Sequence, residues 1–107
     1  MTTLVYVAGP MTKDPTGGLR AACFAGDQLL RAGLTPILPQ LSWQWDFISP
    51  KTWEEWIAYD LPLLSRCDVL LRLPGESKGA DMEVEEAKRL GIPVFHDIAE
   101  LIAHTNT

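Results

Sequence analysis

The chain has 107 residues, 47% of them apolar, which is enough for one compact core and leaves little for a second. Its formal charge of −5 argues against a protein that wraps duplex nucleic acid, because such proteins carry a basic face. No apolar run approaches the ~20 residues that a membrane-spanning helix needs. Cys23 and Cys67 do not form a disulfide framework, and no signal peptide is recognised, so we expect free thiols in a reducing cytoplasm.

The first third of the chain is predicted to form a strand, a helix and a second strand. Thr3–Ala8 is β-branched and apolar and indicates a buried strand, which leaves the sheet sharply at Gly9–Thr12. A helical apolar period runs over Leu19–Ala32 and ends at Gly33. Thr35–Leu38 then predicts a short second strand, so this order indicates a parallel crossover.

The segment Gln40–Pro50 has no period and is rich in aromatic residues, so we expect a loop. Trp43, Trp45 and Phe47 would not be left bare on the surface of a loop. The slightly favoured interpretation is that they cap the core or form a subunit contact. The alternative is that they form a wall for a flat ring such as a nucleobase.

Ser49-Pro50 predicts the start of a helix over Lys51–Ser65. Pro62 lies inside it and predicts a kink near Asp60, because proline cannot donate the helical hydrogen bond. A kink can aim the Asp60 carboxylate at a site. The alternative is an ordinary solvated helix residue.

The remaining elements alternate between strand and helix. We predict a third strand over Cys67–Leu73, a helix over Ala80–Leu90 that stops at Gly91, a short strand over Ile92–Phe95 and a last helix over Ile98–His104. The fold class is therefore α/β, a Rossmann-like or flavodoxin-like parallel sheet of about four to five strands with helices on both faces. In such sheets ligands bind beyond the carboxyl ends of the strands.

The loop before the fourth helix suits an anion. Pro74 and Gly75 stop the third strand, and Ser77 and Gly79 lead into the helix, whose first N–H groups are unpaired. Such a helix start is a plausible seat for a phosphate.

Helix phase singles out Glu83. It falls between Ala87 and Leu90 on the apolar side, whereas Asp81 and Glu85 fall on the wet side. Burial of a carboxylate is costly and raises its pKa. Glu83 is therefore either a functional carboxylate or a charge at the rim of the apolar stripe that reaches water or pairs with an arginine.

The chain lacks a P-loop, a dinucleotide fingerprint and a Gly-x-Ser-x-Gly elbow, and its two histidines form no metal cluster. The remaining candidates for catalysis are carboxylate side chains. Glycosidic bonds are broken by two carboxyl groups, and Glu83 and Asp60 are the candidates.

Three sequence motifs together carry a family resemblance. Tyr6-Val7-Ala8-Gly9-Pro10, Asp60-Leu61 and Ser77-x-Gly79-x-x-x-Glu83 occur in this order, followed by Ala87 and Gly91-x-Pro93-Val94. Over residues 4 to 95 the chain resembles the nucleoside 2-deoxyribosyltransferase superfamily, including its 2'-deoxynucleoside 5'-monophosphate N-glycosidase branch. It looks closest to a small subgroup found in phages and bacteria.

The resemblance implies roles for individual residues. Glu83 would be the nucleophile that attacks C1', and Asp60 would assist departure of the base. Ser77 and Gly79 would hold a 5'-phosphate or 5'-hydroxyl. Tyr6 and Gly9 would line the sugar–base pocket. Beyond what the resemblance implies, we predict that Pro10 and Met11 of the same loop, and Trp43 and Trp45 of the aromatic segment, also bind substrate.

The resemblance also implies a single deoxyribosyltransferase-like domain over residues 1–107, a small nucleoside or nucleotide as partner, and neither a cofactor nor a metal. It implies a homodimer or higher homo-oligomer, often with a site completed by the neighbouring subunit. Met82 and the Trp-rich segment are candidate contacts. The expected location is the cytoplasm, or the host cytoplasm for a phage-encoded protein.

Some residues depart from the family pattern. Asp81 and Glu85 stand where glycines are common and add negative charge, although helix phase turns them away from the site. Pro10 is typical of transferases. Positions 11 and 12 lack an arginine for a phosphate, and the nearby cations are Lys13, Arg20 and Lys78.

The sequence therefore predicts an enzyme that cleaves or exchanges an N-glycosidic bond. The alternatives are a non-catalytic nucleotide-binding module with the same pocket, and a scaffold protein whose Trp-rich segment is only an interface.

Overall fold

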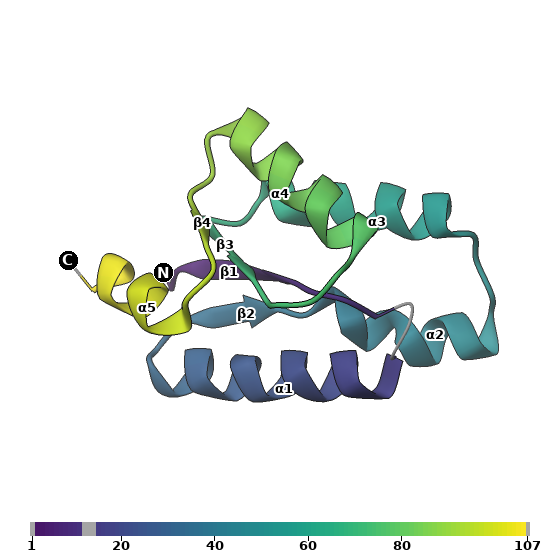
Figure 1. Ribbon diagram of the computed structural model, residues 1–107, viewed down its shortest axis with the longest axis horizontal. Coiled ribbons are helices and arrows are strands. Elements are labelled where there is room, and N and C mark those ends of the chain that lie inside the picture. Colours follow the sequence, from purple (N-terminus) through teal and green to yellow (C-terminus); the bar gives the residue numbers. More distant parts are fainter. Residues whose placement is uncertain (1, 12–14, 107) are drawn as a thin grey trace.

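A four-stranded parallel sheet forms the centre of the protein (Figure 1). The computed structural model describes residues 2–11 and 15–106. The strands are β1 (Leu4–Ala8), β2 (Thr35–Ile37), β3 (Val69–Arg72) and β4 (Val94–Phe95). They lie in the order β2-β1-β3-β4, and each neighbouring pair is parallel. The predicted fold class is confirmed.

Helices cover both faces of this sheet. They are α1 (Pro15–Arg31), the short 3-10 helix η1 (Pro39–Ser42), α2 (Trp43–Ile48), α3 (Trp53–Ser65), α4 (Lys78–Leu90) and α5 (Ile98–Thr105). Figure 1 shows α3 and α4 together on one side of the sheet and α1 on the other. None of these helices, in the described part of the chain, has the length and apolar character needed to cross a bilayer.

The alternation of side chains along the strands divides the core into two clusters. Val5 and Val7 of β1 pack against Leu29 of α1 and Leu101 of α5. Tyr6 and Ala8 point to the opposite face, where they join the residues of α3 and α4. The residues of that second cluster are Tyr6, Ala8, Leu64, Cys67, Leu70, Ala80, Val84 and Ala87. The position of a side chain along β1 therefore determines which layer of helices it packs against.

The strand order places the functional edge of the sheet. The chain leaves β1 through α1 to reach β2 on one side, whereas β3 pairs with β1 on the other side. The direction of winding thus reverses between β1 and β3. Because ligands of open parallel sheets bind beyond the carboxyl ends of the strands at such a reversal, the loops after Ala8 and Arg72 are the expected walls of a site.

The first helix begins earlier than predicted. The prediction placed the glycines 17 and 18 in a loop before Leu19, but α1 already begins at Pro15. Position 18 requires glycine because the backbone of Pro10 lies too close for a side chain: a Cβ there would lie 2.0 Å from the carbonyl oxygen of Pro10. Thr12, in the predicted exit turn, lies outside the described residues.

The prediction of a loop over Gln40–Pro50 was wrong. This segment folds as η1 followed directly by α2. Both helices are shorter than two full turns, so no periodic pattern can build up in the sequence. The aromatic side chains are therefore presented from a helix.

The third helix begins at Trp53 rather than at Lys51. Thr52 caps it: its Oγ1 accepts a hydrogen bond from the Glu55 amide at 3.1 Å, and the Glu55 carboxylate accepts one from the Thr52 amide at 3.1 Å. This reciprocal capping box is a stronger start signal than Ser49-Pro50. The helix continues through Pro62 to Ser65.

The fourth helix, in contrast to the third, starts two residues before its predicted start. Ser77 caps α4 by accepting a hydrogen bond from the Ala80 amide at 3.1 Å, so Lys78 is the first helical residue. The helix ends as predicted at Gly91, whose φ of +76° lies in the left-handed region that favours glycine. β3 and β4 are shorter than the predicted ranges 67–73 and 92–95.

Candidate active site

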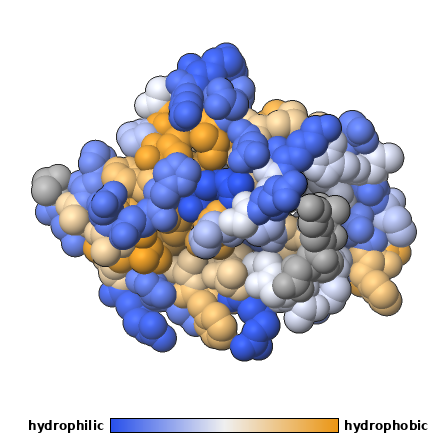
Figure 2. Space-filling model, in the orientation of Figure 1, coloured by the Kyte–Doolittle hydropathy of each residue, from blue (hydrophilic) through white to orange (hydrophobic). Residues whose placement is uncertain are grey.

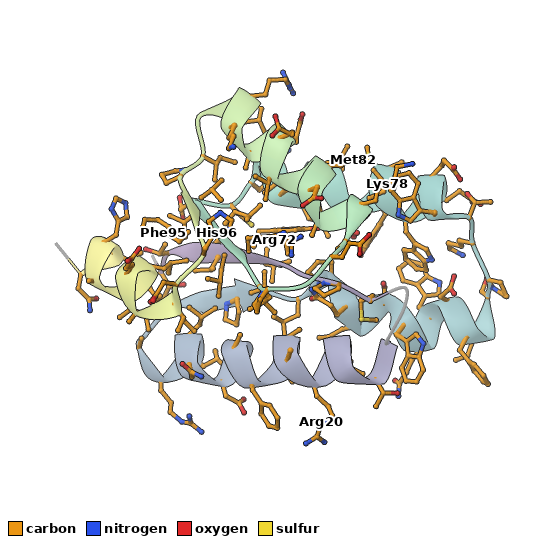
Figure 3. The ribbon with its side chains drawn as sticks, in the orientation of Figure 1. Arg20, Arg72, Lys78, Met82, Phe95 and His96 are labelled. Carbon is orange, nitrogen blue, oxygen red and sulfur yellow. The ribbon has the colours of Figure 1, made fainter. Side chains whose placement is uncertain are left out.

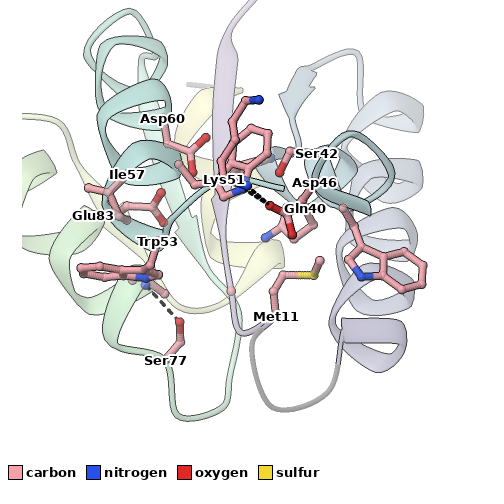
Figure 4. A pocket seen from close by; sticks show the side chains of 16 residues that line it. Met11, Gln40, Ser42, Asp46, Lys51, Trp53, Ile57, Asp60, Ser77 and Glu83 are labelled. Atoms are coloured by element: carbon pink, nitrogen blue, oxygen red, sulfur yellow. Dashed lines mark hydrogen bonds between the residues drawn. The ribbon is translucent and has the colours of Figure 1, made fainter. Parts of the chain in front are cut away.

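A cavity of about 390 Å³ opens at the edge of the sheet where β1, β2 and β3 end (Figure 4). Its volume falls within the range of small-ligand sites. Residues from η1, α2, α3, α4 and the loops after β1 and β3 line it. They are Gly9, Met11, Pro39, Gln40, Ser42, Trp43, Asp46, Lys51, Trp53, Trp56, Ile57, Asp60, Ser77, Gly79, Ala80 and Glu83.

Glu83 lies on the inner side of α4, as helix phase predicts, and is only 5% exposed. The buried Tyr6 hydroxyl donates a hydrogen bond to its Oε2 atom. Burial raises the pKa of Glu83 to about 7, and the negative charge of Asp60 adds to this, while the Tyr6 hydrogen bond and the charge of Arg72 oppose it. The side chain is a buried carboxyl that still lines the cavity.

Asp60 lines the same cavity from α3 and is 9% exposed, so it is not a solvated helix residue. Burial raises its pKa to about 7. Its Oδ1 atom is buried and has no hydrogen-bond partner among the residues that the structure describes. Buried polar atoms are nearly always paired, so this oxygen on a cavity wall is available to a donor from water or from a ligand.

The two carboxyl groups thus have raised pKa values near neutrality and face one cavity from neighbouring helices. Close to pH 7 such a pair can hold one proton between them. One group can then act as an acid and the other as a nucleophile or base. This is the distribution of protons that glycosidic cleavage requires.

The phenol of Tyr6 holds the Glu83 carboxylate through a hydrogen bond. Tyr6 is fully buried and lies outside the cavity lining, although the resemblance implies that it lines the pocket. Burial, followed by the charges of Glu83 and Asp60, raises its pKa far above the usual value, so the hydroxyl stays protonated and donating. It holds one oxygen of Glu83 and leaves the other for chemistry.

The loops after β1 and β3 support each other. Gly9 and Met11 line the cavity. Pro10 does not line it and instead packs against Gly75, where an added Cβ would lie 2.8 Å from the Pro10 Cγ atom. Gly75 has a φ of +116°, which also favours glycine.

Ser77 and Gly79 line the cavity at the start of α4. The Ser77 oxygen accepts from the Ala80 amide and so completes the helix cap (Figure 4). Its hydroxyl hydrogen remains available as a donor. The two residues therefore present a hydroxyl and the start of a helix to the cavity.

The Trp-rich segment divides into two groups. Trp43 lines the cavity, together with Trp53 and Trp56 of α3, two residues that the sequence analysis did not assign to the site. Trp45 lies outside the lining and packs edge-to-face on Trp56, with ring centroids 5.1 Å apart. It thus supports the wall from behind.

Sequence reasoning missed a buried cation, Arg72, at the end of β3. Its guanidinium donates to the carbonyls of Leu73 and Gly75, and it pairs with Asp81 at 3.0 Å. It therefore fastens the loop after β3 to the first turn of α4. A charge in an otherwise apolar strand, Val69–Arg72, is the signal that could have revealed it.

The acidic residues that depart from the family pattern lie outside the cavity. Asp81 is exposed on α4, where it pairs with Arg72, and Glu85 lies 3.9 Å from Lys88. Neither lines the cavity, as helix phase predicts. Met82, the proposed contact residue, is 39% exposed.

Of the three cations near the loop in sequence, Arg20 and Lys78 do not line the cavity. Arg20 lies over the Phe24 ring on α1, and Figure 3 shows it on the outer side of that helix. Lys78 lies over the Trp53 ring, 4.9 Å from its centroid. Lys13 lies outside the described residues. No group of three or more His, Cys, Asp or Glu side chains within residues 2–11 and 15–106 is arranged to hold a metal ion.

A model of the family described as a domain of unknown function (DUF4406) matches residues 3–96. A comparison with curated proteins found no match. Among solved structures, the fold resembles a conserved protein from Enterococcus faecalis V583, with 25% identity and a TM-score of 0.73. That alignment covers 88% of this chain and 62% of the other.

Two further solved structures are deoxyribosyltransferases. The 2-deoxyribosyltransferase of Bacillus psychrosaccharolyticus is 22% identical with a TM-score of 0.63, over 86% of this chain and 69% of that one. The 2-desoxiribosyltransferase of Leishmania mexicana is 20% identical with a TM-score of 0.64, over 86% and 61%. This chain thus spans about two thirds of their length and has their fold, which confirms the resemblance inferred from the sequence.

Proposed function

The chain belongs to the DUF4406 family, and from the geometry of its cavity we propose that it cleaves or exchanges the N-glycosidic bond of a 2'-deoxynucleoside or its 5'-monophosphate. The observation that carries this proposal is the pair of buried carboxyl groups, Glu83 and Asp60, on one cavity at the carboxyl edge of the sheet. The fold of the deoxyribosyltransferases supports it.

In the first step the free oxygen of ionised Glu83 attacks C1' of the deoxyribose. The bond from C1' to the base nitrogen breaks, its electron pair passes to the base, and Asp60 delivers the proton that the departing base needs. The product is a covalent ester between Glu83 and the sugar. Tyr6 keeps the attacking carboxylate in place through the Oε2 hydrogen bond.

In the second step an acceptor attacks the same carbon and releases Glu83. Ionised Asp60 takes the proton of the acceptor, which restores the starting state. Water as acceptor gives the free sugar and makes the protein a hydrolase, whereas another base gives a new nucleoside and makes it a transferase. Both outcomes use the same two carboxyl groups.

We assign the substrate its orientation from the walls of the cavity. Ser77 and Gly79 hold the 5' end of the sugar at the start of α4, where the hydroxyl and helix N–H groups are donors. Gly9 and Met11 line the sugar, while Pro10 sets the shape of their loop. Trp43 lies beside the base, and Trp45 supports the wall from outside.

The direct test is incubation with a panel of 2'-deoxynucleosides and their 5'-monophosphates, with free base measured by chromatography. We expect base release from at least one member and none from the matching ribonucleosides. Stabilisation against heat by these compounds without any release would replace the enzyme by a binding module. Absence of both release and stabilisation would favour a scaffold protein.

We further propose that the protein is a homo-oligomer that uses the end of α2 as an interface. Phe47 and Ile48 are 82% and 81% exposed, and Figure 2 shows apolar side chains at that end of the molecule. Neighbouring Trp45 and Tyr59 are also partly exposed and in contact. Contiguous apolar surface of this kind marks an interface.

Replacement of both Phe47 and Ile48 by serine is expected to convert a dimer or larger species into a monomer, because the apolar contact area is lost. Light scattering coupled to gel filtration measures the mass. Leu30→Ser on α1, which removes another exposed apolar side chain, serves as control. A monomeric parent protein at tens of micromolar would contradict the proposal.

The cysteines agree with the location that we propose, the cytoplasm. Cys23 and Cys67 are both free thiols, and Cys67 is buried. Burial raises the pKa of Cys67 to about 11, which keeps its thiol protonated and inert.

A further inference from the structure

Asp46 is a third carboxylate on the cavity wall and has no part in the proposed chemistry. Its Oδ1 atom accepts hydrogen bonds from the Trp56 indole at 2.7 Å and from the Lys51 amide at 2.9 Å. The Trp56 bond, followed by the Lys51 amide, lowers the pKa of Asp46, so the group is ionised at neutral pH. Its carboxylate is thereby fixed in orientation.

Both of these hydrogen bonds go to one oxygen. Within the described part of the chain, the Oδ2 atom of Asp46 receives none. The nearby ammonium of Lys51 lies over the Trp45 ring and donates to the Ser49 hydroxyl at 3.2 Å. Oδ2 is therefore an ionised acceptor without a donor of its own.

Gln40 adds a second acceptor to the same wall. Its Nε2 atom donates to the Val7 carbonyl at 3.1 Å, and this bond fixes the orientation of the side-chain amide. Its Oε1 atom is buried and unpaired among the described residues, and the side chain is 3% exposed. Figure 4 shows Gln40 and Asp46 on one side of the cavity and Glu83 and Asp60 on the other.

We propose that Asp46, with Gln40, selects bases that carry an exocyclic amino group, namely adenine, cytosine and guanine, over thymine, uracil and hypoxanthine. The inference rests on the proposed function and deepens it. An amino group supplies the donors that two acceptor oxygens lack. A carbonyl in its place would set its lone pairs against the ionised Oδ2 atom of Asp46 and leave the buried Oε1 atom of Gln40 unpaired, which is disfavoured.

The substrates that test this proposal are matched pairs in which the exocyclic amino group becomes an oxygen and the adjacent ring nitrogen gains a hydrogen: deoxycytidine with deoxyuridine, and deoxyadenosine with deoxyinosine. For the parent protein we expect kcat/KM for the amino member of each pair to exceed that of the oxo member by about 10-fold or more. Titration calorimetry with the same compounds on the Glu83→Gln variant measures binding without turnover.

Asp46→Asn is the informative variant. Its amide oxygen can keep the bonds from Trp56 and Lys51, while its NH2 group presents a donor to the cavity. We expect the ratio of amino to oxo substrate to fall by about 10-fold or more. Glu54→Gln, which removes a charge from the exposed side of α3 outside the cavity lining, is the control and should leave the ratio unchanged.

The outcomes separate this proposal from the function on which it rests. Turnover with equal or greater preference for the oxo members, or an unchanged ratio in folded Asp46→Asn, would overturn the role of Asp46 and leave the N-glycosidase intact. If Asp46→Asn does not fold, the order of substrates for the parent protein decides alone. Absence of binding and turnover for all four compounds and for their 5'-monophosphates would overturn the role of Asp46, and the same result over the whole panel of deoxynucleosides and monophosphates would remove both proposals.

Discussion

Replacement of Glu83 by glutamine is expected to reduce base release by about 10⁴-fold or more, because the amide cannot form the glycosyl ester. The substitution changes shape very little, and the glutamine oxygen can still accept the Tyr6 hydrogen bond. Single-turnover chromatography of the released base measures the loss. A variant that retained most of the activity would remove Glu83 from the nucleophile role.

The same substitution is expected to stabilise the protein at alkaline pH. Burial raises the pKa of Glu83 from 4.5 to about 7, so the folded protein binds this proton more tightly than the unfolded chain does. The resulting contribution is complete below pH 4.5 and is lost as pH rises through about 7. At pH 8 the ionised carboxylate therefore lowers the free energy of unfolding by about 3 kcal/mol, and glutamine removes this loss.

Chemical denaturation at pH 4 and pH 8 measures this effect. The variant should exceed the parent in free energy of unfolding at pH 8 and match it closely at pH 4. Glu85→Gln, on the exposed side of the same helix, is the control for the loss of one negative charge. Equal stability of parent and Glu83→Gln at pH 8 would show that the carboxylate is not held in a dry environment.

The buried position of Glu83 could be predicted because α4 is long and amphipathic, and its period alone fixes which side faces the sheet. The parallel sheet followed from the alternation of apolar strands and helices. The buried position of Asp60 was harder to predict, since no sequence pattern marks a single carboxylate on a helix that packs between other elements. Its burial depends on the neighbouring helices.

The wall formed by Gln40 and Asp46 was outside the reach of sequence reasoning. Its helices η1 and α2 are too short to show a period, and its polar groups become significant only through partners distant in sequence. Gln40 bonds to Val7, and Asp46 bonds to Trp56, contacts that no spacing rule encodes. Long-range polar contacts in short elements require coordinates.

The contacts of Arg72 were also not predictable from the sequence, because its three partners lie in a loop and in the next helix. In the sequence it looks like the end of an apolar strand. In the fold it is a buried cation on the Glu83 side of the sheet, and its charge lowers the pKa of Glu83, although burial outweighs it. A buried arginine in a strand is therefore a useful signal for a nearby carboxylate site.

Asp60→Asn is expected to lower kcat for ordinary deoxynucleosides by about 10²- to 10⁴-fold, the usual contribution of a general acid. For the parent protein, activity should rise with pH as Glu83 loses its proton and fall as Asp60 loses its own. Because both pKa values lie at about 7, the profile should be a narrow bell centred near pH 7. Initial rates between pH 5 and pH 9 give this profile.

The variant should change both limbs of that bell. Its alkaline limb should disappear, since asparagine has no proton to lose. Its acid limb should move to lower pH, because the charge of Asp60 contributes to the raised pKa of Glu83 and is absent from asparagine. Glu54→Gln, on the exposed side of α3, should retain the bell of the parent. An alkaline limb that persisted in Asp60→Asn would assign it to another group.

The choice of leaving group distinguishes a proton donor from a residue that only positions the base. The base of 7-methyl-2'-deoxyguanosine already carries a positive charge and departs without a proton. If Asp60 is the donor, Asp60→Asn should cleave this substrate almost as fast as the parent does while cleavage of deoxyguanosine stays slow. An equal loss on both substrates would mean that Asp60 orients the base through the buried Oδ1 atom and that the proton comes from elsewhere. The pair of substrates thus tests whether the carboxyl on α3 acts through its proton or through its position.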